Sequence, residues 1–111
     1  MAKLFTKSFA NRLKKFPLYS QDGKGMNAIV VERFFGGNLT VYILEGDMES
    51  GRLYGLVDLG YGFEYGYISL SDLESIRVPP FHLPLERDRY IESGKVTLGV
   101  AMKQNAEELL H

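Results

Sequence analysis

Short runs of aromatic and branched residues, separated by glycines, dominate the middle of the chain. Residues 52–59 and 63–68 are two such runs, and a Gly-Tyr-Gly turn joins them. Glycine reaches the positive φ angles that tight hairpin turns require, so the pattern predicts an antiparallel hairpin. Residues 26–35 and 39–45 have a similar composition and are joined by Gly-Gly-Asn. Together the four runs predict an antiparallel meander.

A helix is predicted directly after the last of these strands. Ser69 is placed to cap it with Asp72 three residues later, and Ser71 with Glu74 repeats the spacing two residues on. In such a capping box both side chains accept hydrogen bonds from free backbone N–H groups at the helix start. Capping therefore accounts for the serines, and no partner base or G-x-S-x-G sequence points to nucleophilic attack.

The first part of the chain has the periodicity of an amphipathic helix. Thr6 is a candidate cap, apolar residues recur at helical spacing as far as residue 16, and Pro17 stops the helix. Basic residues give the segment its polar character. They are Lys7, Arg12, Lys14 and Lys15. We interpret the segment as a core-packing helix with a solvated face, and contact with an anionic partner is the alternative.

Prolines after the second predicted helix limit what can follow it. Residues 81–85 must run extended, and we expect them to cross the sheet with Phe81, Leu83 and Leu85 packed down. Residues 90–98 predict a short edge strand. A weak final helix follows at 102–110, with a frayed tail over 103–111.

These elements predict the α+β class and a single domain over residues 1–111. The expected architecture is an antiparallel sheet of four to five strands arranged as a meander. An N-terminal helix covers one face, a short helix follows the fourth strand, and an extended C-terminal segment crosses over.

Composition excludes several classes of protein. The 111 residues contain no cysteine, so disulfides, thiolate metal sites and a thiol nucleophile are all excluded. No stretch is apolar and long enough to span a bilayer, and the basic start lacks the apolar run of a secretory signal. We therefore expect a cytoplasmic protein that makes no contact with a membrane.

Candidate catalytic groups are few. His82 lies between two apolar residues, which is typical of a packed or solvated histidine, and His111 is terminal. Acids that could bind a divalent cation are present, although no spacing singles them out. They are Asp58, Glu64, Asp72, Glu86 and Asp88. We expect no catalytic residue, no metal and no cofactor, with a metal-dependent hydrolase as an alternative.

Charge is distributed unevenly, although the net charge is only −1. Residues 1–24 carry six basic residues against Asp22, a net of +5, and residues 40–76 carry seven acids against Arg52, a net of −6. Such asymmetry points to charged partners unless the two regions face each other. We expect an acidic surface for a basic partner, formed by five residues. They are Glu45, Asp47, Glu49, Asp58 and Glu64.

Two further features allow both a structural and a functional interpretation. The tyrosines and phenylalanines of the last predicted hairpin have the composition of a stacking platform for single-stranded nucleic acid, but their acidic surroundings favour cross-strand packing. Glu86, Arg87 and Asp88 form a charged run. We expect Arg87 to pair with Asp72 or Glu74 and so to tie the extended segment to the second helix.

Five motifs link the chain to a known family. L-F-T-K stands near the start, P-L-Y-S at 17–20 and G-L-V at 55–57, and the two most specific motifs are G-Y-I-S-L-S-D-L-E-S-I at 66–76 and L-P-L-E-R-D at 83–88. In this order they resemble domain-of-unknown-function family 2958, a small bacterial family often carried on plasmids, integrative elements and phages. The chain lacks the tryptophan-containing segment of that family around residues 32–42. The family implies no established activity and no catalytic residues.

The resemblance and the charge pattern together suggest a function. We hypothesise a non-catalytic protein-interaction module of a mobile element, whose acidic surface inhibits a host nucleic-acid-targeting defence system by competing for a basic channel. A small nucleic-acid-binding accessory protein that uses the basic first helix is the alternative. The first hypothesis requires a protein partner, and a homodimer formed through an exposed edge strand is compatible with both.

Overall fold

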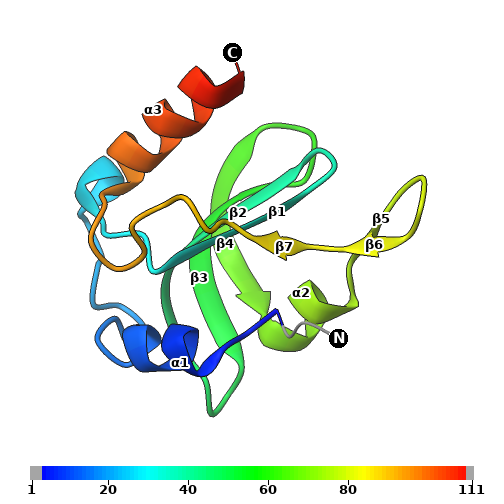
Figure 1. Ribbon diagram of the computed structural model, residues 1–111. Coiled ribbons are helices and arrows are strands. Elements are labelled where there is room, and N and C mark those ends of the chain that lie inside the picture. The colour runs from blue at the N-terminus through cyan, green and yellow to red at the C-terminus, as the bar shows by residue number, and fades with distance from the viewer. Residues whose placement is uncertain (1–3, 110–111) are drawn as a thin grey trace.

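Five antiparallel strands form the central sheet of the computed structural model, which describes residues 4–109, with side chains described as far as residue 106 (Figure 1). In spatial order the strands are β4 (Phe63–Ser69), β3 (Arg52–Asp58), β2 (Leu39–Asp47), β1 (Glu32–Gly36) and β7 (Glu86–Arg87). Consecutive pairing of β1 to β4 confirms the predicted meander. The sheet and its helices confirm the α+β class.

Helices cover both faces of this sheet. α1 (Lys7–Leu13) and α2 (Leu70–Ser75) pack on one face, and α3 (Leu98–Leu109) packs on the other. The remaining described elements are η1 (Gly25–Asn27), a 3-10 turn, and a two-stranded ribbon of β5 (Arg77–Val78) and β6 (Leu83–Pro84). The ribbon projects from the body of the molecule beyond α2 (Figure 1).

Two hydrophobic clusters hold the layers together, one on each face of the sheet. On the α1 side, Phe9 packs edge-on against Phe34 with ring centroids 5.7 Å apart. On the α3 side, Tyr42 packs in a cluster with Leu98. Because successive side chains of a strand point to opposite faces, β2 supplies Ile43 to the first cluster and Tyr42 to the second.

The caps confirm both predicted helix starts. The hydroxyl oxygens of Thr6 and Ser69 each accept a hydrogen bond from the backbone N–H three residues on, at 3.1 and 3.0 Å. The second candidate cap, Ser71, shares a hydrogen bond with the Ser69 hydroxyl instead. α1 ends at Leu13 rather than near residue 16, because the N–H groups of Lys15 and Phe16 bond to carbonyl oxygens three residues back and close tight turns.

The strand predicted at 26–35 is shorter in the structure, and β1 begins only at Glu32. The residues before it contact a loop from the C-terminal part of the chain, where the Val30 N–H donates to the Val96 carbonyl oxygen at 2.9 Å. This contact forms one isolated bridge rather than a ladder. The edge strand predicted at 90–98 is therefore wrong.

The last helix is longer than predicted. α3 starts at Leu98, which is buried in the core, rather than at residue 102. Its main chain is helical as far as Leu109. The end of the expected frayed tail at 103–111, including His111, lies outside the described residues.

The proline-rich segment runs along the edge of the sheet and does not cross its face. β7 pairs with β1, where Arg87 stands opposite Phe34. Leu85 is buried as expected, but Phe81 and Leu83 are 77% and 55% exposed. The expectation that all three apolar residues pack down is wrong for these two, because they belong to the projecting ribbon.

Gly55 is a position where the sheet has no room for a side chain. A Cβ atom added there would lie 1.9 Å from the carbonyl oxygen of Tyr42, a backbone atom of the adjacent strand. We predict that Gly55→Ala lowers the free energy of unfolding by about 3 kcal/mol or more, because the two strands must separate to admit the methyl group. Urea unfolding followed by circular dichroism measures this change.

Gly66→Ala is the matched control for that variant. Gly66 stands opposite Gly55 in the β3–β4 pair, yet nothing lies within 4 Å of its added Cβ. We expect a gain of about 0.5 kcal/mol, because alanine loses less conformational entropy than glycine on folding. Equal destabilisation by the two substitutions would contradict the close approach of the strands at Gly55.

Candidate functional site

The half of the sheet formed by β3 and β4 carries exposed aromatic side chains on the α3 side. Leu56, a member of the α3-side cluster, stands opposite Tyr65, and Tyr54 stands opposite Tyr67. Opposite residues of antiparallel strands point to the same face. Tyr65 and Tyr67 are nevertheless 46% and 45% exposed, and Phe63 is exposed to a similar extent. We call Tyr54, Phe63, Tyr65 and Tyr67 the aromatic row.

Contacts between the rings fix the aromatic row in place. Tyr54 stacks on Tyr65 with ring planes 9° apart and centroids at 6.2 Å, and its centroid lies 4.9 Å from that of Tyr67. The Arg52 guanidinium lies 4.2 Å from the centroid of the Tyr67 ring, which is a cation–π contact. The cross-strand packing expected for these residues is therefore confirmed, and a large part of each exposed ring stays open to solvent.

A register shift in β2 brings an acid to the same face. The pairing of β2 with β3 slips between Ile43 and Glu45, so that Glu45 stands opposite Tyr54. The Glu45 side chain is 1% exposed, and its carboxylate accepts hydrogen bonds from the N–H groups of Tyr19 and Gln21 at 2.7 and 2.8 Å. Glu45 therefore does not belong to an exposed acidic surface, because it anchors a loop to the sheet.

Gln21 holds the same loop through its side chain. The amide donates to the carbonyl oxygens of Ile29 and Leu44 at 2.8 and 2.6 Å, and it accepts from the Ile29 N–H at 2.6 Å. Tyr19 has a φ of 73°, a left-handed conformation that residues other than glycine rarely adopt. The contacts of Gln21 and Glu45 hold the loop in this conformation and place the Tyr19 hydroxyl near that of Tyr67.

A cavity of about 180 Å³ opens between this loop and the aromatic row. Its polar and aromatic lining comes from Gln21, Asp22, Glu45, Tyr54 and Tyr65, and we call it the tyrosine niche. Burial raises the pKa of Tyr54, and the charges of Glu45 and Asp22 and the Tyr65 hydroxyl act in the same direction. The niche thus disfavours a negative charge on Tyr54.

Sequence patterns do not point to the loop residues of this site. Tyr19, Gln21 and Asp22 belong to a stretch that has turn composition and no periodicity. Their role depends on the register shift in β2, and nothing in the spacing of residues 39–47 predicts that shift.

β4 is the outer strand of the sheet, and within the described residues no strand pairs with its free edge. Glu64 is the only charged residue among the seven of β4, and the strand contains no lysine and no proline. Charged residues, lysine above all, and proline usually protect natural edge strands from pairing with other chains. The backbone groups on the free side of β4 are therefore open to a further extended segment.

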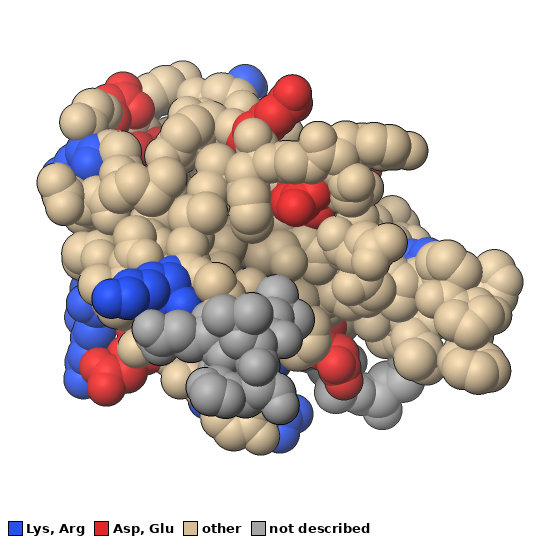
Figure 2. Space-filling model, turned by 90° about the horizontal axis from the view of Figure 1, so that it is seen from above, with Lys and Arg blue, Asp and Glu red and all other residues tan. Residues whose placement is uncertain are grey.

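The other acids of the expected acidic surface lie apart from one another. Asp47 and Glu49 lie at the β2–β3 turn, whereas Asp58 and Glu64 lie toward the other end of β3. Hydrogen bonds from Ser50 and from the Glu49 N–H lower the pKa of Asp47, and two glycine N–H groups of the next turn donate to Asp58. On the face seen in Figure 2, acidic and basic side chains are scattered among uncharged ones.

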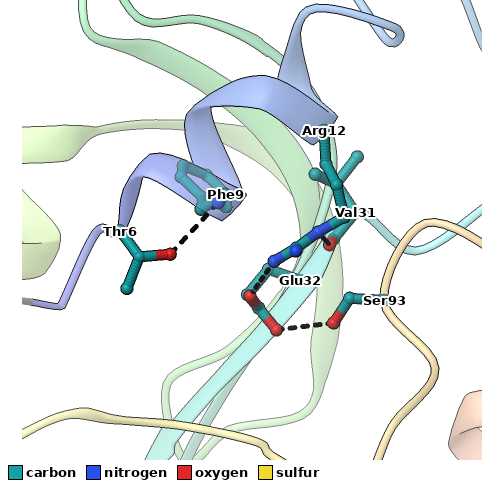
Figure 3. A network of polar contacts seen from close by, with 6 residues as sticks. All are labelled: Thr6, Phe9, Arg12, Val31, Glu32 and Ser93. Carbon is teal, nitrogen blue, oxygen red and sulfur yellow. Dashed lines mark hydrogen bonds and ion pairs between the residues drawn. The ribbon is translucent and has the colours of Figure 1, made fainter.

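One basic residue of α1 has a structural role (Figure 3). Arg12 reaches from α1 to β1, where its guanidinium pairs with the Glu32 carboxylate and also donates to the Val31 carbonyl oxygen. The Ser93 hydroxyl donates to the second oxygen of Glu32 at 2.7 Å. Burial raises the pKa of Glu32, although Ser93 and Arg12 both favour its ionised form. The exposed basic residues of this segment are Lys7, Lys14 and Lys15.

The charged run near the C-terminal end of the sheet forms a different ion pair from the one expected. The Arg33 guanidinium donates to Asp88 at 2.8 Å, and the two side chains are 10% and 13% exposed. The same guanidinium lies over the ring of Phe35. The pair therefore fixes the chain after β7 to β1.

Arg87 does not make the contact that the sequence suggested. Among the described residues it pairs with neither Asp72 nor Glu74. The pairing of β7 with β1 places it near Glu32 instead, where its charge favours the ionised carboxylate. Asp72 follows the Ser69 cap, and Glu86 is exposed in β7.

No cluster of three or more histidine, aspartate or glutamate side chains within the described residues is arranged to hold a metal ion. In the same part of the chain, no helix combines the length and the apolar character needed to cross a membrane. The aromatic row, the tyrosine niche and the free edge of β4 offer charge, aromatic rings and open backbone groups.

Comparison with known proteins identifies a family. Residues 4–108 match the family described as Protein of unknown function (DUF2958), which confirms the family suggested by the sequence motifs. No curated protein and no solved structure matches the chain. The family match spans the sheet, the helices and the tyrosine niche, and its description names no activity.

Removal of Arg12 should destabilise the fold. Arg12→Ala leaves the Glu32 carboxylate buried without its cation, and we predict a loss of about 2–3 kcal/mol in the free energy of unfolding. This is less than for a fully buried pair, because a quarter of the Arg12 side chain is exposed. Lys14→Ala is the matched control on the same helix, with an expected change within about 0.5 kcal/mol in urea unfolding. Similar losses in both variants would contradict the structural role of Arg12.

Neutralising Glu45 should loosen the loop that it anchors. In Glu45→Gln one amide oxygen can still accept a hydrogen bond, but the NH2 group then faces the second backbone donor. We predict a loss of about 2 kcal/mol, the size of a hydrogen bond to a charged group. Urea unfolding measures this loss, and faster hydrogen exchange at the Tyr19 and Gln21 amides locates it. Glu49→Gln, in an exposed turn, is the control that should leave both measurements unchanged.

Proposed function

The chain belongs to the DUF2958 family, and we propose that it is a non-catalytic protein-binding module that binds a partner along the free edge of β4. One observation carries the proposal. Within the described residues β4 is unpaired on its outer side, and Phe63, Tyr65 and Tyr67 on this strand are 42–46% exposed. An open strand edge beside contiguous exposed aromatic surface is typical of an interaction site.

Strand addition is the mode of binding that this edge supports. An extended segment of a partner laid along β4 forms hydrogen bonds with the free N–H and C=O groups of the strand. Every second side chain of the segment then lies on the same face as Tyr65 and Tyr67. Gly66 between them carries no side chain, so the opposite face of the added strand meets no obstacle there.

The chemistry of the tyrosine niche favours a basic segment. Asp22 and Glu45 supply negative charge, and the faces of Tyr54 and Tyr65 offer cation–π contacts. Lysine and arginine carry their charge on a long apolar stem, and a cavity of about 180 Å³ has room for such a head group. The proposed partner therefore presents lysine or arginine from an extended segment.

The family resemblance adds finer proposals about biological setting. They are a mobile-element origin and the inhibition of a host nucleic-acid-targeting defence system. Asp47 and Glu49 lie at one end of β3, and Asp58 and Glu64 toward the other, which argues against competition through one acidic surface. The geometry instead supports a version of this proposal in which a basic segment of such a host protein binds at β4.

Selection of displayed peptides tests the proposed function. A random peptide library selected against the protein should yield segments in which arginine or lysine alternates with branched residues. Tyr65→Ala should weaken binding of these peptides about tenfold or more, because aromatic anchors at interface centres often contribute more than 1 kcal/mol each. Fluorescence anisotropy with a labelled peptide measures the change. Tyr90→Ala is the matched control, since Tyr90 is 89% exposed and lies outside the aromatic row.

Two outcomes would overturn the proposal. Selected peptides without enrichment of basic residues would remove the role of the niche, and unchanged affinity in Tyr65→Ala would remove the role of the edge. Analytical ultracentrifugation covers the alternative occupant. A dimer that dissociates in Tyr65→Ala would assign the β4 edge to a second copy of this chain.

A further inference from the structure

A groove of about 800 Å³ lies between the start of α1 and the segment that contains β7. The residues that define its chemistry are Lys7, Phe35, Arg87, Arg89 and Tyr90. β7 is at the opposite end of the strand order from β4, so this groove is separate from the edge proposed for protein binding. Its volume is typical of a ligand site.

The cations of this groove form no ion pair with the described part of the chain, although Arg87 lies near the buried Glu32. Among the described residues, Lys7, Arg87 and Arg89 take part in no hydrogen bond or ion pair through their side chains. Arg12 and Arg33, by contrast, both reach buried or half-buried acids. The ion pairs of the core thus leave Lys7 and Arg89 free at one groove, and Arg87 lies beside them without an ion pair to any described residue. Glu86 is the single acid among the described residues of the groove lining.

Aromatic rings accompany these cations. Tyr90 is 89% exposed, so its ring is free to stack on another planar group. Its backbone is fixed, because the Tyr90 N–H donates to Asp88 at 2.9 Å and Asp88 in turn pairs with Arg33. Phe35 lines the same groove with the Arg33 guanidinium 4.8 Å from its ring centroid.

We propose that this groove binds a short single-stranded segment of nucleic acid. Phosphates contact Lys7, Arg87 and Arg89, and a base stacks on Tyr90. Free cations that track a groove, combined with an exposed ring, are the combination by which proteins bind single strands without reading their sequence. The inference goes beyond the proposed protein-binding function and uses different residues. It also differs from binding along the basic helix, because Lys14 and Lys15 are not part of the groove lining.

Fluorescence anisotropy with labelled oligo-deoxythymidine and oligo-uridine tests the inference. The full chain should bind both, with an affinity that falls as salt is raised. Lys7→Glu combined with Arg89→Glu should weaken binding about tenfold or more and reduce the slope of log affinity against log salt by about 0.7 for each lost phosphate contact. Tyr90→Ala should weaken binding about fivefold or more and leave that slope unchanged, because it removes stacking and no charge.

Lys14→Glu combined with Lys15→Glu is the matched control. It changes the net charge by the same amount, at exposed positions near the other end of α1. The control variant should keep its affinity within about threefold, because charges distant from a groove are screened by salt. Thermal melts of all variants confirm folding, and Arg87 is left unchanged because it lies near the buried Glu32.

Three results would overturn the inference. They are the absence of salt-dependent oligonucleotide binding, an equal loss in the control variant, and unchanged affinity in Tyr90→Ala. A poly-glutamate peptide could instead displace the oligonucleotide from the wild-type chain and bind Tyr90→Ala with unchanged affinity. This result would assign the groove to an acidic protein. Because Tyr65 is remote from the groove lining, Tyr65→Ala should leave oligonucleotide binding intact, which separates this test from that of the β4 edge.

Discussion

The irregular pairing of β2 with β3 is the constraint on which the candidate site depends. The register slips between Ile43 and Glu45, which places Glu45 opposite Tyr54 and Gly46 opposite Leu53. Glu45 accepts the backbone N–H groups of the loop before β1, and Gly46 donates its own N–H to the Phe16 carbonyl oxygen at 3.0 Å. A side chain at Gly46 would lie 2.5 Å from Leu53. The shift thus holds the end of the α1 segment on one side of the strand and the tyrosine niche on the other.

Some charged residues in the described part of this protein form ion pairs that hold the fold together, and others there lie unpaired on the surface. Around β1, Arg12 and Arg33 are paired with Glu32 and Asp88, and these four groups bind helix α1 and the chain after β7 to the sheet. Removing one member of such a pair is costly because its partner stays desolvated. Other charges lie on the surface, where Lys7 and Arg89 line the groove at β7 and the acids of the β3–β4 half are divided between the two ends of β3.

Much of the fold could be predicted because its determinants are local. Glycine turns, alternation along the strands and the caps at Thr6 and Ser69 each act over a few residues. The errors occur where a distant segment decides the outcome, as at Val30, which contacts the loop after β7 where a longer strand was expected. The candidate site was harder to predict for the same reason. Glu45 looks like a surface acid in the sequence, and only its pairing with the Tyr19 loop, 26 residues away, shows that it is buried.

The partial cover of the sheet by α3 connects the fold to the proposed binding function. Tyr42 and Leu56 are buried under this helix, whereas Tyr65, the next residue across the sheet from Leu56, is 46% exposed. α3 covers this sheet face as far as β3 and leaves β4 open. The exposed apolar area on β4 is therefore area that a larger helical layer would bury. The aromatic row is already held by ring stacking and by Arg52, so a partner meets a surface that needs little further ordering. These features support the proposal of recognition at a preorganised strand edge, with charge setting the choice of partner.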